Sequence, residues 1–180
     1  MAANRERLKA LIARKCLLKG DFVLASGARS SVYFDCKRAT LDPEGIVLIG
    51  ELLWESISAL PGDVAAVGGP TIGADPIVGH LAALSYMKGK PMAAFLVRKE
   101  AKEHGTRRLL ENPPASGSKV VIFEDVVTSG GSTLEAIRAS QEAGLEIAAV
   151  FCLVDREQGG EKALAAYDYR PLFKKSEFEL

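Results

Sequence analysis

Two adjacent acids and a run of small polar residues stand close together in the second half of the sequence. Glu124 and Asp125 follow the apolar run 120–123, and a Thr/Ser/Gly segment occupies residues 128–132. Ionised carboxylates only accept hydrogen bonds, which suits the two hydroxyls of a sugar. Glycines let backbone N–H groups approach a phosphate closely, and a helix that begins directly after them adds unpaired N–H groups. The pattern predicts a site for a phosphorylated ribose, although a lone Ser-Gly-Gly more often only caps a helix.

The second group of residues that could take part in chemistry is a basic segment. Residues 98–108 hold five Lys or Arg and one His against two acids, in a chain whose formal net charge is zero. The surrounding stretch 99–118 is polar, contains Gly105, Pro113 and Pro114, and predicts a long mobile loop between two core strands. Long loops of this kind are often lids, and a cationic lid can stabilise a departing anion and exclude water. A solvated loop is the equally ordinary alternative.

Alternating patterns of strand and helix predict where these groups lie. Strands are expected at 64–67, 92–97, 119–123 and 147–154, and helices at 44–60, 75–87 and 132–143. Apolar strands separated by helices predict an α/β fold with a parallel sheet, which binds ligands at the carboxyl ends of its strands. A helix at 4–15 and a hairpin-like pair at 22–24 and 32–34 predict a small N-terminal hood. We therefore expect one domain over 1–180, with a hood at 1–40, a core at 41–160 and a catalytic loop at 99–118.

Composition narrows the class of protein. The chain has 180 residues, of which 48% are hydrophobic and 26% charged, so it is typical of a folded globular domain. Balanced charge argues against nonspecific binding to nucleic acid, and no apolar run is long enough to cross a membrane. Three widely spaced cysteines favour neither a disulfide framework nor structural zinc. We expect reduced thiols and a cytoplasmic location.

These motifs resemble a known family. The apolar strand, the acid pair and the Thr/Ser/Gly loop are similar to the signature of type I phosphoribosyltransferases, whose loop holds the 5-phosphate of phosphoribosyl pyrophosphate (PRPP). The basic segment resembles more narrowly the catalytic loop of orotate phosphoribosyltransferases. Its pattern Arg-Lys-x-x-Lys-x-His-Gly is matched by Arg98, Lys99, Lys102 and His104. Segments 24–35, 68–74 and 155–157 also agree, so the resemblance spans roughly residues 20–160.

The resemblance implies a reaction and a set of site residues. Orotate and PRPP would give orotidine 5′-monophosphate and pyrophosphate, with Mg²⁺ held mainly by substrate and water and no protein ligand set for the metal. Catalysis is expected from Lys102, His104 and Asp125, and orotate binding from Thr128 and Arg156. The residues expected to bind PRPP are Arg98, Lys99, Lys102, His104, Glu124, Asp125, Val126, Val127, Thr128, Ser129, Gly130, Gly131 and Ser132. The resemblance also implies a homodimer in which Arg98 and His104 act on the neighbouring site.

Departures from the family pattern leave alternatives open. Ala25 and Gly73 stand where many members carry Lys, and the sequence alone does not place Lys37 as a substitute. One alternative is a phosphoribosyltransferase for another base. A second is a regulator that keeps the PRPP pocket and binds nucleic acid, and a third is an α/β interaction domain in which the loop is coincidental.

Overall fold

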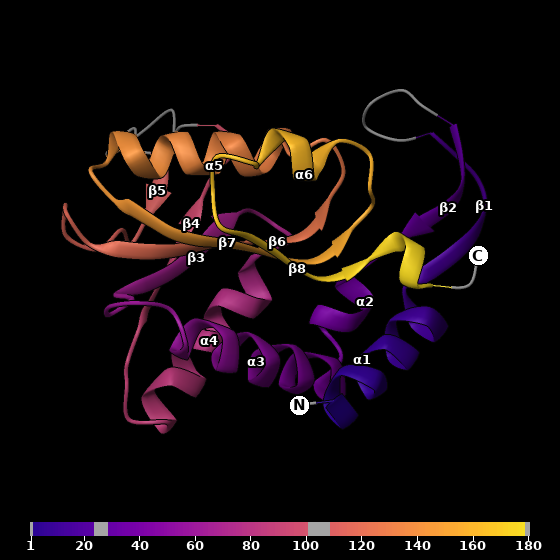
Figure 1. Ribbon diagram of the computed structural model, residues 1–180, viewed down its shortest axis with the longest axis horizontal. Helices are drawn as coiled ribbons and strands as arrows, with labels where there is room; N and C mark the ends of the chain where they lie inside the picture. The colour runs from indigo at the N-terminus through magenta and orange to yellow at the C-terminus, as the bar shows by residue number, and fades with distance from the viewer. Residues whose placement is uncertain (1, 24–28, 101–108, 179–180) are drawn as a thin grey trace.

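The computed structural model describes residues 2–23, 29–100 and 109–178. It has three layers, in which one sheet lies between two sets of helices (Figure 1). Helices α1–α4 cover one face of the sheet, and α5 and α6 cover the other. The β1–β2 hairpin extends to one side, close to the C-terminal end of the chain. The predicted α/β fold with helices on both faces is confirmed.

The central sheet has six strands in the order β5-β4-β3-β6-β7-β8. Its strands are β3 (Ala66–Pro70), β4 (Ala93–Val97), β5 (Leu110–Glu111), β6 (Lys119–Val127), β7 (Glu146–Asp155) and β8 (Tyr169–Lys174). The four predicted strands are present, and they pair in parallel. Two edge strands were not predicted: β8, parallel to β7, and β5, antiparallel to β4. Strand β5 is too short to show a period, and Pro171 interrupts the pattern of β8.

Helix α3 (Pro43–Ser58) begins after a capping residue. The Asp42 side chain accepts hydrogen bonds from the backbone N–H groups of Glu44 and Gly45, at 3.0 and 2.9 Å. Pro43 occupies the first turn, where its missing N–H costs nothing. The other layer-forming helices are α4 (Asp75–Met87), α5 (Gly131–Glu142) and the short α6 (Gly160–Ala163). Helix α4 connects the parallel strands β3 and β4, and α5 connects the parallel strands β6 and β7, each across one face of the sheet.

The N-terminal segment, predicted to form a hood, contains α1 (Ala2–Lys15), β1 (Leu17–Val23), β2 (Arg29–Phe34) and the short α2 (Lys37–Thr40). The hairpin is longer than the predicted three-residue strands, because the antiparallel pairing also includes the polar residues of β1 and β2, with an irregularity between Lys19 and Phe22. Arg5 on α1 donates to the Leu172 carbonyl oxygen at 2.9 Å and pairs with Glu177 in the 3-10 turn η1 (Lys175–Glu177). These contacts join the first helix to the C-terminal end.

Two hydrophobic clusters hold the layers together. The larger one lies between the sheet and α1, α3 and α4, and the smaller one lies between the sheet and α5. Phe123 on β6 belongs to the first and its neighbour Ile122 to the second, because side chains alternate along a strand. Burial on both faces fixes the register of β6 and hence the position of the acids at its end. Among the described residues, no helix is long and apolar enough to cross a membrane.

Candidate active site

The acid pair lies inside β6 and not after it. The sequence predicted a strand ending at Phe123, but β6 continues to Val127, and Glu124 pairs with Cys152 on β7. Only 6% of Glu124 and 9% of Asp125 is exposed. The strand continues through the acids because hydrogen bonds to β7 satisfy its backbone N–H and C=O groups. The side chains of Glu124 and Asp125 point to opposite faces of the sheet. Both carboxylates are therefore held by a rigid element.

Two hydroxyl groups fix the carboxyl group of Glu124. Its Oε2 accepts hydrogen bonds from Ser132 Oγ at 2.9 Å and Thr133 Oγ1 at 3.3 Å, both from the first turn of α5. Burial, and secondly the neighbouring charge of Asp125, raise the pKa of Glu124 to about 8. The hydroxyl of Ser132, expected to face a phosphate, is thus turned toward this acid.

The carboxyl group of Asp125 lies against a glycine. A Cβ on Gly73 would stand 2.3 Å from Asp125 Oδ1, so no other residue fits there without displacing the acid. Asp125 Oδ1 also accepts the Val126 N–H at 2.9 Å. Burial raises the pKa of Asp125, and the charge of Lys37 opposes this effect. The small residue in the 71–74 loop leaves the space that this carboxylate occupies.

The predicted phosphate loop connects β6 to α5. Gly130 has φ +84°, a conformation that favours glycine, and directly precedes the helix. The first backbone bond of α5 runs from the Leu134 N–H to the Gly130 carbonyl oxygen at 2.9 Å, so the N–H groups of residues 131–133 have no acceptor within the helix. The Gly160 N–H donates to the Thr128 carbonyl oxygen at 3.0 Å and supports the loop from α6. The loop thus presents N–H groups at a helix N-terminus, which is an anion-binding arrangement.

Arg156 follows the end of β7 at the same edge of the sheet. Its side chain is 5% exposed, and Nη2 donates to the Val32 carbonyl oxygen of the hairpin at 3.2 Å. Its Nε is buried and has no hydrogen-bond partner within the described residues. Burial lowers the pKa of Arg156, although the guanidinium remains charged at any ordinary pH. The backbone N–H of Arg156 donates to the Val127 carbonyl oxygen at 2.9 Å, so the backbone of Arg156 lies beside the start of the Thr128 loop.

Arg98 and Lys99 follow β4 beside this loop. Arg98 Nη1 pairs with Glu111 Oε1 at 3.5 Å, and both side chains are partly exposed. A hollow of about 500 Å³ separates β4 from α5, and Arg98, Lys99, Gly131 and Ser132 are part of its lining. Lys102 and His104, expected to be catalytic, and Ala25 lie outside the described residues.

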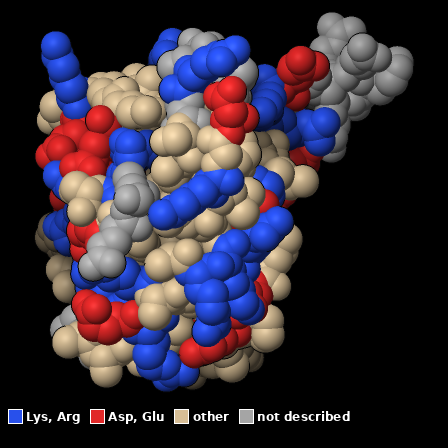
Figure 2. Space-filling model, turned by 90° about the vertical axis from the view of Figure 1, so that its right-hand side faces the viewer, with Lys and Arg blue, Asp and Glu red and all other residues tan. Residues whose placement is uncertain are grey.

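The structure places a basic group, Lys37, that the sequence alone could not place. Burial lowers the pKa of Lys37, but the nearby charges of Asp125 and Asp35 outweigh this effect and raise it, so the ammonium faces the acid side of the site. Arg14, Lys15, Lys37 and Arg38 surround a shallow hollow of about 620 Å³. Figure 2 shows how Lys and Arg gather on the face that carries α1 and the hairpin. Segment 98–108 is therefore not the only concentration of positive charge, because folding brings cations from α1 and α2 together.

Comparison with known proteins identifies the family. A sequence model of the phosphoribosyl transferase domain matches residues 40–174. An orotate phosphoribosyltransferase of Bradyrhizobium sp. (strain ORS 278) is 42% identical, with 98% of each chain covered. The chain belongs to the orotate phosphoribosyltransferase family. The resemblance inferred from the acid pair and the basic segment is confirmed, and with it the type I phosphoribosyltransferase fold and a transferase function.

Solved structures of the orotate phosphoribosyltransferase family agree with this assignment. The Mycobacterium tuberculosis H37Rv enzyme in complex with Fe(III) dicitrate has a TM-score of 0.84 and 36% identity, covering 98% of this chain and 99% of that one. The same enzyme in complex with PRPP has a TM-score of 0.79 and 33% identity, with 97% and 98% covered. The similarity thus extends over nearly the whole length of both chains.

The acid pair does not form a protein cage for a metal ion. Within residues 2–23, 29–100 and 109–178, no group of three or more His, Cys, Asp or Glu is placed to hold one. Glu124 and Asp125 offer two carboxyl groups at one edge. That donor set fits a Mg²⁺ ion that keeps most of its ligands from substrate phosphates and water.

Proposed function

We propose that the carboxyl edge of β3, β6 and β7 binds PRPP and orotate and forms orotidine 5′-monophosphate and pyrophosphate. The observation that carries the proposal is the arrangement of one buried acid pair, one helix N-terminus and one buried guanidinium at a single edge. These groups match the diol, the phosphate and the anionic base of the two substrates. The orotate phosphoribosyltransferase relatives support the choice of base.

The 5-phosphate would bind to the loop that opens α5. Backbone N–H groups of residues 129–132 and the hydroxyls of Thr128 and Ser129 supply donors. Val126 and Val127 contribute through the backbone, since Val127 is buried in the core. The supporting contact from Gly160 keeps this loop in place before the phosphate arrives. Preorganised donors stabilise an anion without having to reorganise.

The acids would hold the ribose. Asp125 accepts hydrogen bonds from the ribose hydroxyls next to the reacting carbon, and Glu124 accepts a further one once it is ionised. Because burial raises the pKa of Glu124 to about 8, binding of the sugar should be accompanied by release of its proton. The hydroxyls of the substrate then replace the solvent that a carboxylate normally requires.

The chemical step exchanges one bond at C1 of the ribose. The bond from C1 to pyrophosphate oxygen breaks with its electron pair on the oxygen. N1 of orotate, after its acidic ring proton has been lost to water, donates a pair to form the new C–N bond. Lys102 and His104, with Arg98 and Lys99, supply positive charge or a proton to the departing pyrophosphate. Mg²⁺ bound to the diphosphate would neutralise part of the same charge. Orotate already carries an acidic ring, so the protein needs no strong general base.

Orotate itself would lie between the loop and the turn after β7. The Arg156 guanidinium is directed to a carboxylate or carbonyl group, and Thr128 supplies a neighbouring hydroxyl or backbone group. A buried Nε without a partner is costly in the free protein, and an acceptor on the base would satisfy it. The positive charge of the guanidinium would favour an acidic base over a neutral one.

Two copies of the chain are proposed to form the working unit, with Arg98 and His104 of each acting on the neighbouring site. The described surface exposes large apolar side chains on α3 and α4 and in the loops that precede them, which a second copy could cover: Leu41, Val47, Ile72, Tyr86 and Met87. Mixing inactive His104→Ala and Asp125→Asn chains under exchange should restore activity in mixed dimers. Verified exchange without activity would contradict action in trans. The three buried free cysteines are consistent with a proposed cytoplasmic location.

One assay tests the proposed function. Orotate, PRPP and Mg²⁺ are mixed with the protein, and the ultraviolet absorbance of orotate is followed. We expect the absorbance to fall only when all components are present. Folded protein that leaves orotate unchanged but converts hypoxanthine, adenine or uracil would make it a phosphoribosyltransferase for another base. Binding of PRPP without any turnover would favour the regulator.

A further inference from the structure

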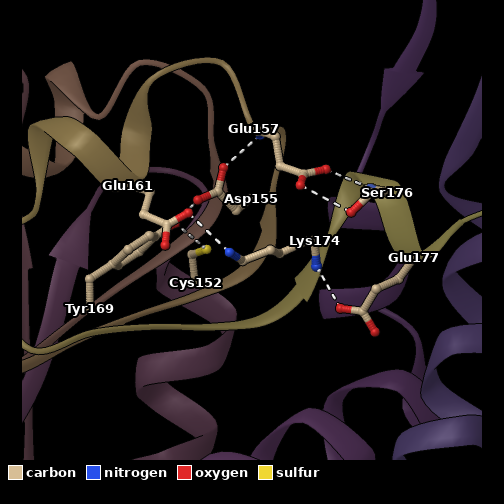
Figure 3. Close-up of polar contacts among 8 residues, drawn as sticks. All are labelled: Cys152, Asp155, Glu157, Glu161, Tyr169, Lys174, Ser176 and Glu177. Atoms are coloured by element: carbon tan, nitrogen blue, oxygen red, sulfur yellow. Dashed lines mark hydrogen bonds and ion pairs between the residues drawn. The ribbon is translucent and has the colours of Figure 1, made fainter.

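A polar network involves the two residues that flank Arg156 in the chain, Asp155 and Glu157 (Figure 3). Its centre is Asp155, the last residue of β7, which is fully buried. Asp155 Oδ2 accepts a hydrogen bond from Tyr169 Oη at 2.9 Å, and Oδ1 accepts one from the Glu157 N–H at 2.7 Å. The reaction proposed above uses none of these groups. A buried carboxyl group with both oxygens engaged inside the protein must serve the structure around it.

The direction of the hydrogen bonds in this network can be assigned. Tyr169 has one hydroxyl proton, and it is donated to Asp155, because a carboxylate can only accept. Cys152 Sγ lies 3.0 Å from Tyr169 Oη, so the thiol is the donor in that contact. Burial, and secondly the neighbouring Cys152, raise the pKa of Tyr169, and burial also raises that of Cys152. Both protons are therefore retained at neutral pH, and the chain of donors ends on Asp155.

The residue after Arg156 is anchored just as firmly. Glu157 has φ +56°, a left-handed conformation that is uncommon for a residue with a side chain. Its carboxylate accepts hydrogen bonds from the Ser176 N–H at 2.6 Å and Ser176 Oγ at 3.0 Å. Figure 3 shows these contacts joining the turn to the 3-10 segment after β8. The strained backbone persists because contacts on both sides hold it.

Arg156 thus stands between two fixed neighbours. Its guanidinium is tied on one side to the Val32 carbonyl oxygen, while the buried Nε has no partner in the described structure. We propose that Tyr169 and Glu157 are positioning residues that fix the direction of the Arg156 guanidinium and so determine the affinity for the acidic base. This inference rests on the proposed function, because it takes orotate as the ligand of Arg156. It assigns base recognition to the C-terminal strand as well as to the site edge.

Two variants remove one anchor each. Tyr169→Phe deletes the donor to Asp155 and keeps the ring, and Glu157→Ala deletes both bonds to Ser176. Each should raise the KM for orotate about ten-fold, the order of magnitude expected for the loss of one hydrogen bond. The KM for PRPP should stay within about two-fold, because the phosphate loop and acid pair lie on other elements. Glu157→Gln keeps an acceptor for Ser176 and should restore most of the affinity.

A matched control uses a nearby pair that does not touch the turn. Glu161 accepts a hydrogen bond from Lys174 Nζ at 3.0 Å, and the side chain of Glu161 is largely exposed while that of Lys174 is partly exposed. Glu161→Gln should leave both KM values unchanged. Thermal melts of every variant distinguish a loss of folding from a change in the position of the Arg156 guanidinium. If Tyr169→Phe does not fold, the exposed Glu157 still provides the test.

A double-mutant cycle with Arg156→Ala decides between positioning and general destabilisation. If the anchors act through Arg156, Tyr169→Phe should cause no further rise in the KM for orotate once the guanidinium is absent. An additive loss, or an equal rise for both substrates, would overturn the proposal. The Arg156 Nε–H resonance of the free protein, assigned with Arg156→Lys, should also shift in the anchor variants. An unchanged resonance would likewise overturn the proposal, and this readout does not depend on orotate turnover, which tests the proposed function separately.

Discussion

The raised pKa of Glu124 predicts that this residue makes the protein less stable as the pH rises. The carboxyl group has an ordinary pKa of 4.5 and a pKa of about 8 when buried in the fold. Between these values the folded chain keeps a proton that the unfolded chain has released. Its contribution to stability is therefore complete below pH 4.5 and is lost as the pH rises toward 8.

The size of the effect follows from the same two values. The span from 4.5 to about 8, at about 1.4 kcal/mol for each pH unit, gives a change on the order of 4 kcal/mol between pH 5 and pH 9. Because Glu124 is only 6% exposed, solvent screens little of this energy. Glu124→Gln removes the titration and keeps an oxygen that can accept from Ser132 and Thr133. A change of 1 kcal/mol shifts the Tm by roughly 2–4 °C in a chain of this size. The Tm of the variant minus that of the wild type should therefore increase by about 8–16 °C between pH 5 and pH 9.

Thermal melts at pH 5, 7 and 9 test this prediction. The control is Glu135→Gln, which removes an exposed acid from α5, the helix whose first turn donates hydrogen bonds to Glu124. The Tm of this control should change with pH as that of the wild type does. The effects of other titrating groups cancel when the curve of Tm against pH for the variant is subtracted from that for the wild type. Parallel Tm curves for the wild type and Glu124→Gln would refute the assignment of a protonated Glu124 at neutral pH.

Three further predictions concern the site. Gly73→Ala should raise the KM for PRPP about ten-fold or more, because the new Cβ would stand 2.3 Å from Asp125 Oδ1 and displace that carboxylate. The Tm should stay nearly unchanged, since the Asp125 side chain can rotate away. Normal kinetics would contradict the close approach. Gly130→Val should lower both the Tm and the affinity for PRPP, measured by calorimetry, since φ is +84° and a Cβ would lie 3.3 Å from that of Ala163. Lys102→Ala should lower kcat about 10²- to 10³-fold with little change in the KM for orotate, provided that chemistry limits the rate; nearly full turnover in steady-state assays would remove Lys102 from the mechanism.

The repeating elements of the fold were predictable because they follow local rules. Helix α4 begins and ends at the predicted residues, and α3 begins one residue before the predicted start. The edge strands were not predictable, since β5 forms two residues and depends on its pairing with β4. Similarly, β6 extends past the predicted end because β7 pairs with its acidic residues.

The same distinction separates the site residues. The acid pair, the loop glycines and Arg156 form patterns that the chain order displays. Lys37 and the Tyr169–Asp155 contact do not, because their meaning comes from residues distant in sequence that folding brings together. The orientation of the Ser132 hydroxyl toward Glu124 also required side-chain geometry.

The bond that joins the two ends of the basic segment limits how far that segment can reach. The Arg98 N–H donates to the Leu109 carbonyl oxygen at 2.8 Å, so residues 99–108 leave and return at one point on the sheet edge. A chain that must return to its starting point extends at most half its contour length, roughly 17 Å for this segment at about 3.4 Å per residue. His104 lies near the middle of that contour. A homodimer can therefore use His104 in trans only if the neighbour's phosphate loop comes within about 20 Å of the Arg98–Leu109 bond, a geometric criterion that any solved dimer will meet or fail.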